Sequence, residues 1–215
     1  MIFDCDGVLV DSDRLALRIQ ADRLTELGLP TTYEDSVREY LGIGLPATLV
    51  KVERSLGRPV PQQWVDDLER EVWAVFGREL QPVPGVVRAL DELETQTCIA
   101  SSGSHAKMRY TLGLTGLLER FEGRIFSGDE VEHGKPAPDL FLHAAARMGF
   151  AASRCVVVED SPYGVEAAVA AGMQVAGFAG ETPREALRAA TVVFDDMSAL
   201  PRLVDDLLSP SAPAG

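Results

Sequence analysis

The chain has 215 residues, a formal net charge of −13, 46% apolar residues and 25% charged residues. This composition is close to that of an ordinary globular protein and argues against wholesale disorder. The negative charge argues against nucleic acids and acidic membrane surfaces as main partners. No apolar stretch approaches the roughly 20 residues that span a bilayer, and no secretory signal opens the chain. We therefore expect a cytoplasmic protein, and whether its natural N-terminus extends before Met1 stays open.

The three cysteines are each placed in an apolar run. They are not close to one another in sequence, and no metal-binding spacing of Cys or His surrounds them. We predict buried, reduced thiols at Cys5, Cys98 and Cys155.

The first third of the chain is predicted to be one strand followed only by helices. A short apolar strand covers residues 1–5, and the apolar spacing from residue 12 to Gly28 predicts a helix. Further helices are predicted over residues 35–40, 47–56 and 62–76. Two prolines and a glycine within residues 81–85 predict a domain boundary there.

After this boundary, short β-rich runs alternate with helical patterns. Strands are predicted over residues 97–100, 125–126, 155–158, 174–178 and 191–194, and helices over 86–93, 106–112, 140–148 and 165–171. This alternation predicts an α/β fold with a parallel, Rossmann-like sheet covered on both faces. The predicted core domain comprises residues 1–13 and 80–215, and the predicted helical insertion comprises residues 14–79. The tail, residues 209–215, is expected to be frayed.

Polar side chains follow the predicted strands at four places along the chain. Since ligands bind beyond the carboxyl ends of the strands in open parallel sheets, we expect these side chains to meet at one edge. They are Asp4, Asp6, Ser101, Ser102, Lys135, Glu159 and Asp160.

Four carboxylates in one place need a cation. Two unit charges about 4 Å apart repel by roughly 1 kcal/mol in water and about 4 kcal/mol at an effective dielectric constant of 20. A few carboxylates suit Mg²⁺, which keeps water ligands and accepts phosphate oxygens. The metal and Lys135 together would reverse the local charge and admit a phosphate. A carboxylate can also attack phosphorus, so one of Asp4 and Asp6 is expected to be the nucleophile and the other the general acid/base.

Four segments of the chain resemble the motifs of the haloacid dehalogenase superfamily, in the same order. Residues 3–12 match its first motif, hhhDxDGxhhDS, where h is apolar and x is any residue. Residues 99–102 resemble the second motif, residues 134–138 the third, and residues 157–168 the fourth, hhhEDSxxGhxAA. The resemblance covers nearly the whole chain.

This resemblance implies a role for each polar residue. Asp4 would be the nucleophile and a magnesium ligand. Asp6 would be the general acid/base and would lend its backbone carbonyl to the metal. Lys135 would hold the transferring phosphoryl group and balance Asp4. The remaining roles are phosphate binding by Ser101 and Ser102, and metal binding by Asp160, with Glu159 supporting or sharing that role.

The nearest branch contains β-phosphoglucomutase, phosphoglycolate phosphatase and related sugar-phosphate phosphatases. In that branch a helical cap follows the first motif and determines leaving-group specificity, as residues 14–79 would do here. The mutase has a His where this chain has Ala16, and an Arg in a cap loop where this chain has residues 42–45. Both differences favour hydrolysis over isomerisation.

The resemblance therefore implies a Mg²⁺-dependent phosphatase that acts on a small phosphomonoester through an aspartyl phosphate. A sugar phosphate and a phosphorylated hydroxy acid both stay open as substrates, and a β-phosphoglucomutase-type isomerase is the alternative. Dehalogenation of a 2-haloacid and a purely regulatory role are disfavoured by the intact motifs. For His105, a surface position is favoured over substrate contact. A monomer is expected from the resemblance alone.

Overall fold

The computed structural model describes residues 1–208, so the predicted frayed tail lies outside the described residues. Its centre is a six-stranded parallel sheet with strand order β3-β2-β1-β4-β5-β6. The strands are β1 (Ile2–Phe3), β2 (Cys98–Ser101), β3 (Ile125–Ser127), β4 (Val156–Glu159), β5 (Gln174–Phe178) and β6 (Val192–Phe194). This confirms the predicted α/β fold. The first strand is shorter than the predicted 1–5. After Phe3 the backbone N–H of Asp4 still donates a hydrogen bond to the carbonyl of Val158, and the chain then turns at Gly7.

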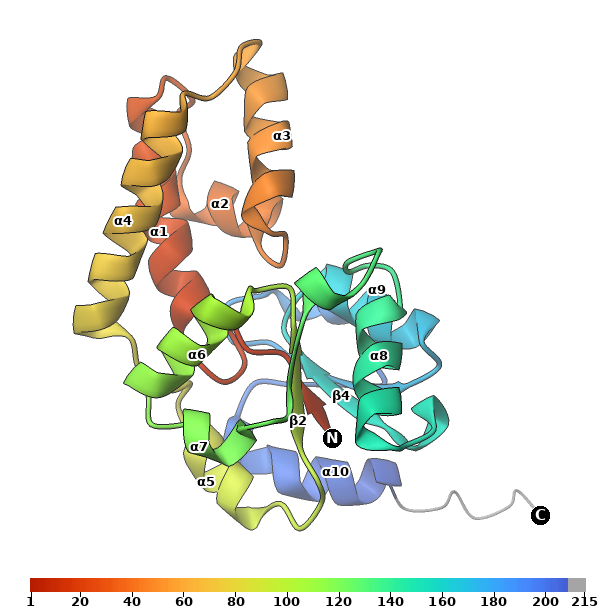
Figure 1. Ribbon diagram of the computed structural model, residues 1–215. Coiled ribbons are helices and arrows are strands. Elements are labelled where there is room, and N and C mark those ends of the chain that lie inside the picture. The colour runs from red at the N-terminus through yellow and green to blue at the C-terminus, as the bar shows by residue number, and fades with distance from the viewer. Residues whose placement is uncertain (209–215) are drawn as a thin grey trace.

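Both faces of the sheet are covered by helices, because successive side chains of a strand point to opposite faces. Ile2 packs on one face against α8 (Asp139–Met148) and α9 (Pro162–Ala170). Phe3 packs on the other face. The helices there are α5 (Val86–Glu92), α6 (His105–Leu114), α7 (Leu118–Phe121) and α10 (Leu200–Leu208) (Figure 1). The short helices η1 (Gly128–Glu130), η2 (Ala152–Arg154), η3 (Arg184–Leu187) and η4 (Met197–Ala199) complete the connections.

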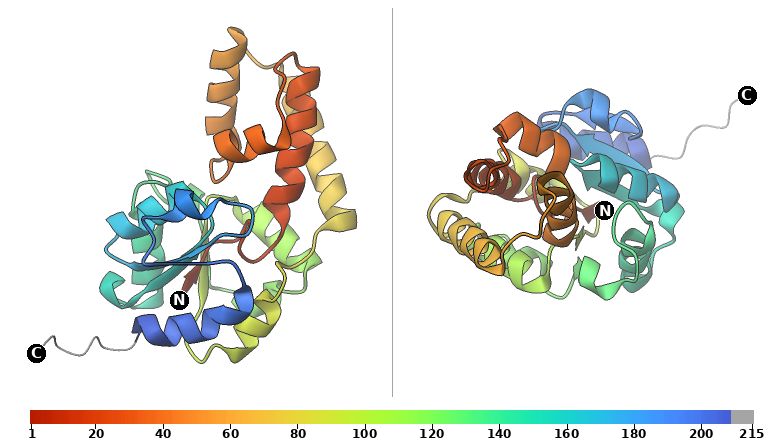
Figure 2. Two further views of the ribbon diagram at one scale, coloured as in Figure 1. Left: turned by 180° about the vertical axis from the view of Figure 1, so that it is seen from behind. Right: turned by 90° about the horizontal axis from the view of Figure 1, so that it is seen from above.

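The chain between β1 and α5 forms a group of four helices that stands apart from the sheet (Figures 1 and 2). These are α1 (Ser12–Glu26), α2 (Tyr33–Tyr40), α3 (Leu45–Leu56) and α4 (Gln62–Glu79). They pack around an apolar cluster of their own that includes Leu24 and Val52. A capping box between Thr32 and Asp35 starts α2, and Gly57 ends α3 in a left-handed conformation. The exact domain limits stay a prediction.

Two predictions about the whole chain can be compared with residues 1–208. All three cysteines are buried and free, as predicted. No helix in this part of the chain is both long and apolar enough to cross a membrane.

Candidate active site

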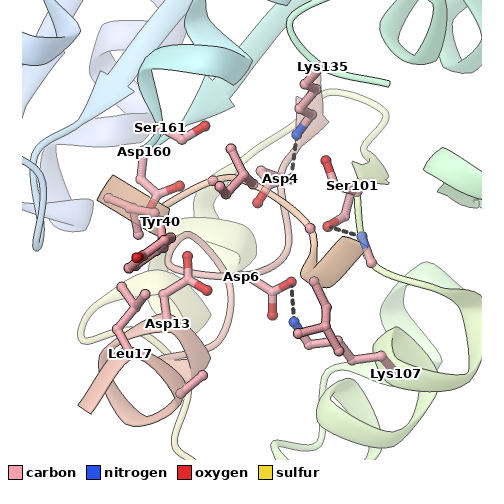
Figure 3. A pocket seen from close by; sticks show the side chains of 18 of the residues that line it. Asp4, Asp6, Asp13, Leu17, Tyr40, Ser101, Lys107, Lys135, Asp160 and Ser161 are labelled. Carbon is pink, nitrogen blue, oxygen red and sulfur yellow. Dashed lines mark hydrogen bonds and ion pairs between the residues drawn. The ribbon is translucent and has the colours of Figure 1, made fainter. Parts of the chain in front are cut away.

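The seven predicted site residues all line one cavity of about 370 Å³ at the carboxyl ends of β1, β2 and β4. The four-helix group lines the other side of this cavity. Figure 3 shows side chains from these separate segments pointing into the shared space. The structure therefore brings together the residues that the strand ends predicted: Asp4, Asp6, Ser101, Ser102, Lys135, Glu159 and Asp160.

Lys135 joins two buried carboxylates. Its Nζ lies 2.6 Å from Oδ1 of Asp4 and 2.6 Å from Oε1 of Glu159, and its side chain is only 2% exposed. Burial raises the pKa of Asp4 to about 7, with Lys135 opposing this and Glu159 adding to it. One ammonium group thus serves two carboxylates, and it does not outweigh the effect of burial on Asp4.

The second oxygen of Glu159 is also occupied. Oε2 accepts hydrogen bonds from the backbone N–H of Ser161 at 2.7 Å and from its hydroxyl at 2.9 Å. Gly164 lies against the same carboxylate, and a Cβ at this position would be 1.7 Å from Oε1. In this arrangement Glu159 holds Lys135 in place.

Asp6 has different partners from Asp4. Its Oδ2 lies 2.8 Å from Nζ of Lys107, and its Oδ1 accepts a hydrogen bond from the hydroxyl of Ser12. Burial alone would raise the pKa of Asp6, but Lys107 and Ser12 outweigh burial and lower the pKa below its ordinary value. The two aspartates are only two residues apart, yet their surroundings shift their pKa values in opposite directions.

A glycine turn brings Asp160 close to the first motif. Gly7 has φ +71°, and a Cβ there would lie 2.0 Å from Oδ2 of Asp160, so both the conformation and the contact require glycine. Asp160 is 3% exposed. Burial, followed by the nearby Asp13, raises the pKa of Asp160 well above its ordinary value.

The end of β2 presents hydroxyl groups beside a helix start. Ser101 is buried, and its Oγ accepts a hydrogen bond from the backbone N–H of Gly103 at 3.3 Å. Ser102 is exposed. Ser104 caps α6 by accepting from the backbone N–H of Lys107. An oxygen-rich anion can be held here by hydroxyl and backbone N–H groups.

Two residues of the site were missed by the sequence analysis. Lys107 reaches Asp6 from the first turn of α6, and Asp13 enters the cavity from the first turn of α1. Burial, with the charge of Asp6 adding to it, raises the pKa of Asp13 to about 8. Their helix-turn positions look like ordinary solvated charges in the sequence, so only the fold reveals them. His105, by contrast, lies outside the cavity wall and bonds Glu130 at 2.8 Å.

The donor set fits a divalent cation of the Mg²⁺ type. Asp4, Asp13 and Asp160 line the same cavity, where Figure 3 shows their side chains around one space, and each has a raised pKa. Within residues 1–208, no group of three or more acidic, histidine or cysteine side chains is placed so that it could hold a metal ion. Mg²⁺ does not need one, since it keeps several waters and binds through one or two carboxylates.

Comparison with known proteins decides the family. The family model of haloacid dehalogenase-like hydrolases matches residues 1–172. The chain belongs to this family. The 6-phosphogluconate phosphatase of Escherichia coli (strain K12) is 29% identical over 205 residues, which cover 94% of this chain and 93% of that protein.

Solved structures agree with this assignment. A conserved haloacid dehalogenase-like protein of unknown function from Agrobacterium tumefaciens str. C58 superimposes with a TM-score of 0.86 at 34% identity, covering 97% of this chain and 98% of that one. A β-phosphoglucomutase from Clostridium difficile shares the fold with a TM-score of 0.79 at 18% identity, covering 96% of this chain and 95% of that one. The predicted superfamily and branch are confirmed, and so is a hydrolase of the phosphatase kind.

Proposed function

We propose that this enzyme hydrolyses a small phosphomonoester, either a sugar phosphate or a phosphorylated hydroxy acid, through a covalent phosphate on Asp4. The observation that carries the proposal is the pair of aspartates with separate lysines. Asp4 is paired with Lys135 at 2.6 Å and Asp6 with Lys107 at 2.8 Å, in one cavity. The similarity to a 6-phosphogluconate phosphatase supports this class of substrate.

In the first step, a carboxylate oxygen of Asp4 attacks phosphorus, and the bond between phosphorus and the leaving oxygen breaks. Asp6 gives its proton to that oxygen. Lys135 and the hydroxyls of Ser101 and Ser102 hold the phosphoryl oxygens. This step needs the protonated form of Asp6, so we expect Asp6 to take up a proton when substrate is bound, while Lys107 keeps the nearby charge of Asp13.

In the second step, water attacks the phosphorus of the aspartyl phosphate, and the bond from phosphorus to Asp4 breaks. Asp6, which the first step leaves ionised, takes the proton of this water. Inorganic phosphate leaves, and Asp4 is regenerated.

We propose that Asp4, Asp160 and the backbone carbonyl of Asp6 hold Mg²⁺. The bound cation would offset the crowded carboxylate charge and attract the phosphate oxygens. Glu159 would act on the site by orienting Lys135, because both its oxygens are already hydrogen-bonded.

The group α1 to α4 is proposed to be the cap of the enzyme, comprising residues 14–79. Ala16 and residues 42–45 line the cavity, so the positions at which the mutase carries His and Arg face the substrate here without those groups. This supports hydrolysis over the alternative, a β-phosphoglucomutase-type isomerase. We retain a monomeric, cytoplasmic enzyme as a prediction.

The test is phosphate release from a panel of phosphomonoesters with Mg²⁺, using the native chain and Asp4→Asn. We expect loss of at least about 10³-fold in kcat for Asp4→Asn, because the nucleophile is removed. The matched control is Asp22→Asn, an exposed position on α1, which should keep normal activity. Unchanged phosphate release by Asp4→Asn would refute the proposal, and interconversion of glucose 1- and 6-phosphates without net hydrolysis would favour the isomerase.

A further inference from the structure

We infer that the leaving group taken by this site is uncharged, as in a polyol or sugar phosphate, and that Gln20 of the cap contacts it. The inference rests on the proposed phosphatase function and chooses between the two substrate classes left open there. It predicts rejection of carboxylated substrates, including the substrate after which the 6-phosphogluconate phosphatase relative is named.

The space available to the leaving group extends beyond the catalytic cavity. We call the cavity described above the inner chamber, and an adjoining cavity of about 230 Å³ between the cap and α6 the outer chamber. The two share part of their walls: Ala16, Gln20, Ile43, Leu45, Ser104 and Lys107. A leaving group of several carbon atoms can therefore extend from the reacting phosphate past Gln20 into the outer chamber.

The inner chamber offers no spare positive charge to a second anionic group. Among the described residues its walls contain two cations, Lys107 and Lys135. Both are paired with carboxylates, at 2.8 Å and 2.6 Å. The walls hold six acidic side chains: Asp4, Asp6, Asp13, Asp129, Glu159 and Asp160. Even a bound divalent cation leaves the acids in excess, so a carboxylate on the substrate would be repelled.

The outer chamber is equally unsuited to an anion. Its one added charged residue is Glu69, which is acidic. Most of its wall is apolar, including Leu68, Val72 and Phe76. The cation on its wall, Lys107, is the one already paired with Asp6. A carboxylate there would lose hydration without gaining a free ionic partner, whereas a neutral chain or ring with an apolar face would not bear this cost.

Gln20 supplies the polar recognition that an uncharged leaving group needs. It lies on the shared wall of the two chambers, and its Nε2 is covered from solvent with no hydrogen-bond partner within residues 1–208. An unpaired buried amide is unfavourable. A rotation of the terminal amide toward a substrate hydroxyl would satisfy it, since a hydroxyl both donates and accepts hydrogen bonds.

The test uses substrate pairs that differ only by a carboxylate in place of a CH₂OH group: sorbitol 6-phosphate against 6-phosphogluconate, and glycerol 3-phosphate against 3-phosphoglycerate. With Mg²⁺ present, we expect kcat/KM for the neutral member to exceed that for the carboxylated member by about tenfold or more. Gln20→Arg adds a cation to the chamber wall and should reduce this ratio by about tenfold. Gln63→Arg adds the same charge at an exposed position of α4 and should leave the ratio within about twofold.

A ratio cancels any loss of folded enzyme, so a purely structural role of Gln20 would not change it. Preference of the native chain for the carboxylated members, or a ratio unmoved by Gln20→Arg, would overturn the inference. Either result leaves the phosphatase proposal standing provided that hydrolysis depends on Asp4. Absence of hydrolysis that depends on Asp4, for every substrate of the panel, would instead refute the proposed function itself.

Discussion

Replacing Asp13 by asparagine should stabilise the protein when no divalent cation is present. Asp13 is partly buried in the cavity, where its carboxylate faces the acidic Asp6, Asp4 and Glu159 as well as Lys107. Asparagine has nearly the same shape and carries no charge. Asp13→Asn therefore removes like-charge repulsion while keeping the packing of α1.

The size of the effect follows from the pKa of Asp13, which burial, aided by Asp6, raises from 3.8 to about 8 in the folded protein. At a pH between these two pKa values, Asp13 keeps its proton in the folded state but has lost it in the unfolded state. The free energy of unfolding then falls with rising pH, by at most about 1.4 kcal/mol per pH unit. The side chain retains some contact with solvent, so we expect the free energy of unfolding to be lowered by a total of about 1–3 kcal/mol at pH 8.

The measurement is urea unfolding of the native chain and of Asp13→Asn between pH 4 and pH 8 in a chelator. The two should differ least near pH 4, where the carboxyl is protonated in the folded state and still partly protonated in the unfolded state. At pH 8 the variant should be more stable and melt about 2–4 °C higher for each kcal/mol.

Millimolar Mg²⁺ should reduce the difference, because a cation near the cluster compensates the ionised carboxylate. Asp22→Asn, at an exposed position on the same helix, is the control and should show no such pH dependence. Equal or lower stability of Asp13→Asn at pH 8 in the chelator would show that this reading of the carboxylate cluster is wrong.

Two further substitutions test single contacts. Gly7→Ala places a Cβ 2.0 Å from Asp160 Oδ2 and should lower kcat/KM by about 100-fold or more. The control is Gly57→Ala, which has a similar φ of +67° but no atom within 4 Å of the added Cβ. It should cost only about 1 kcal/mol of stability. A similar activity loss in both would mean that backbone strain, and not the displaced carboxylate, is responsible. The second substitution concerns Glu130. Burial alone would raise the pKa of its carboxyl, but hydrogen bonds from the backbone N–H of Ser127 and from two histidines lower it below 4.5. Glu130→Gln should therefore lose about 1 kcal/mol at pH 7 by chemical denaturation, and the loss should vanish as the pH falls below about 4. A loss that stays constant down to pH 3 would contradict this.

The sheet and most of its helices could be predicted because their patterns are local. Apolar runs mark the strands, and in a parallel sheet the residues after them must meet at one edge, which locates Asp4, Ser101 and Asp160 without a structure. Helix α7 escaped prediction because four residues are too few to show a helical period. Helix α10 carries such a period in Leu200 and Val204, and it lies beyond the last predicted strand.

Two residues of the site could not be predicted, for a different reason. Asp13 and Lys107 each lie in the first turn of a helix, where charged residues are common and usually solvated. Their role depends on which way each helix leaves the sheet, and this is set by packing of the four-helix group and of α6. No spacing within a single segment contains that information.

The pairing of lysines with carboxylates explains why two aspartates so close in sequence differ chemically. Lys135 is shared between Asp4 and Glu159, so its charge is divided, and burial leaves the pKa of Asp4 raised to about 7. Lys107 is paired within the cavity with Asp6, which also accepts a hydrogen bond from the hydroxyl of Ser12. The pKa of Asp6 is therefore lowered despite burial. The proposed roles need an ionised Asp4 and, in the first step, a protonated Asp6, so these two shifts have to reverse when cation and substrate bind. Glu159 shares Lys135 with Asp4 and adds to the raised pKa of the proposed nucleophile, after the larger effect of burial.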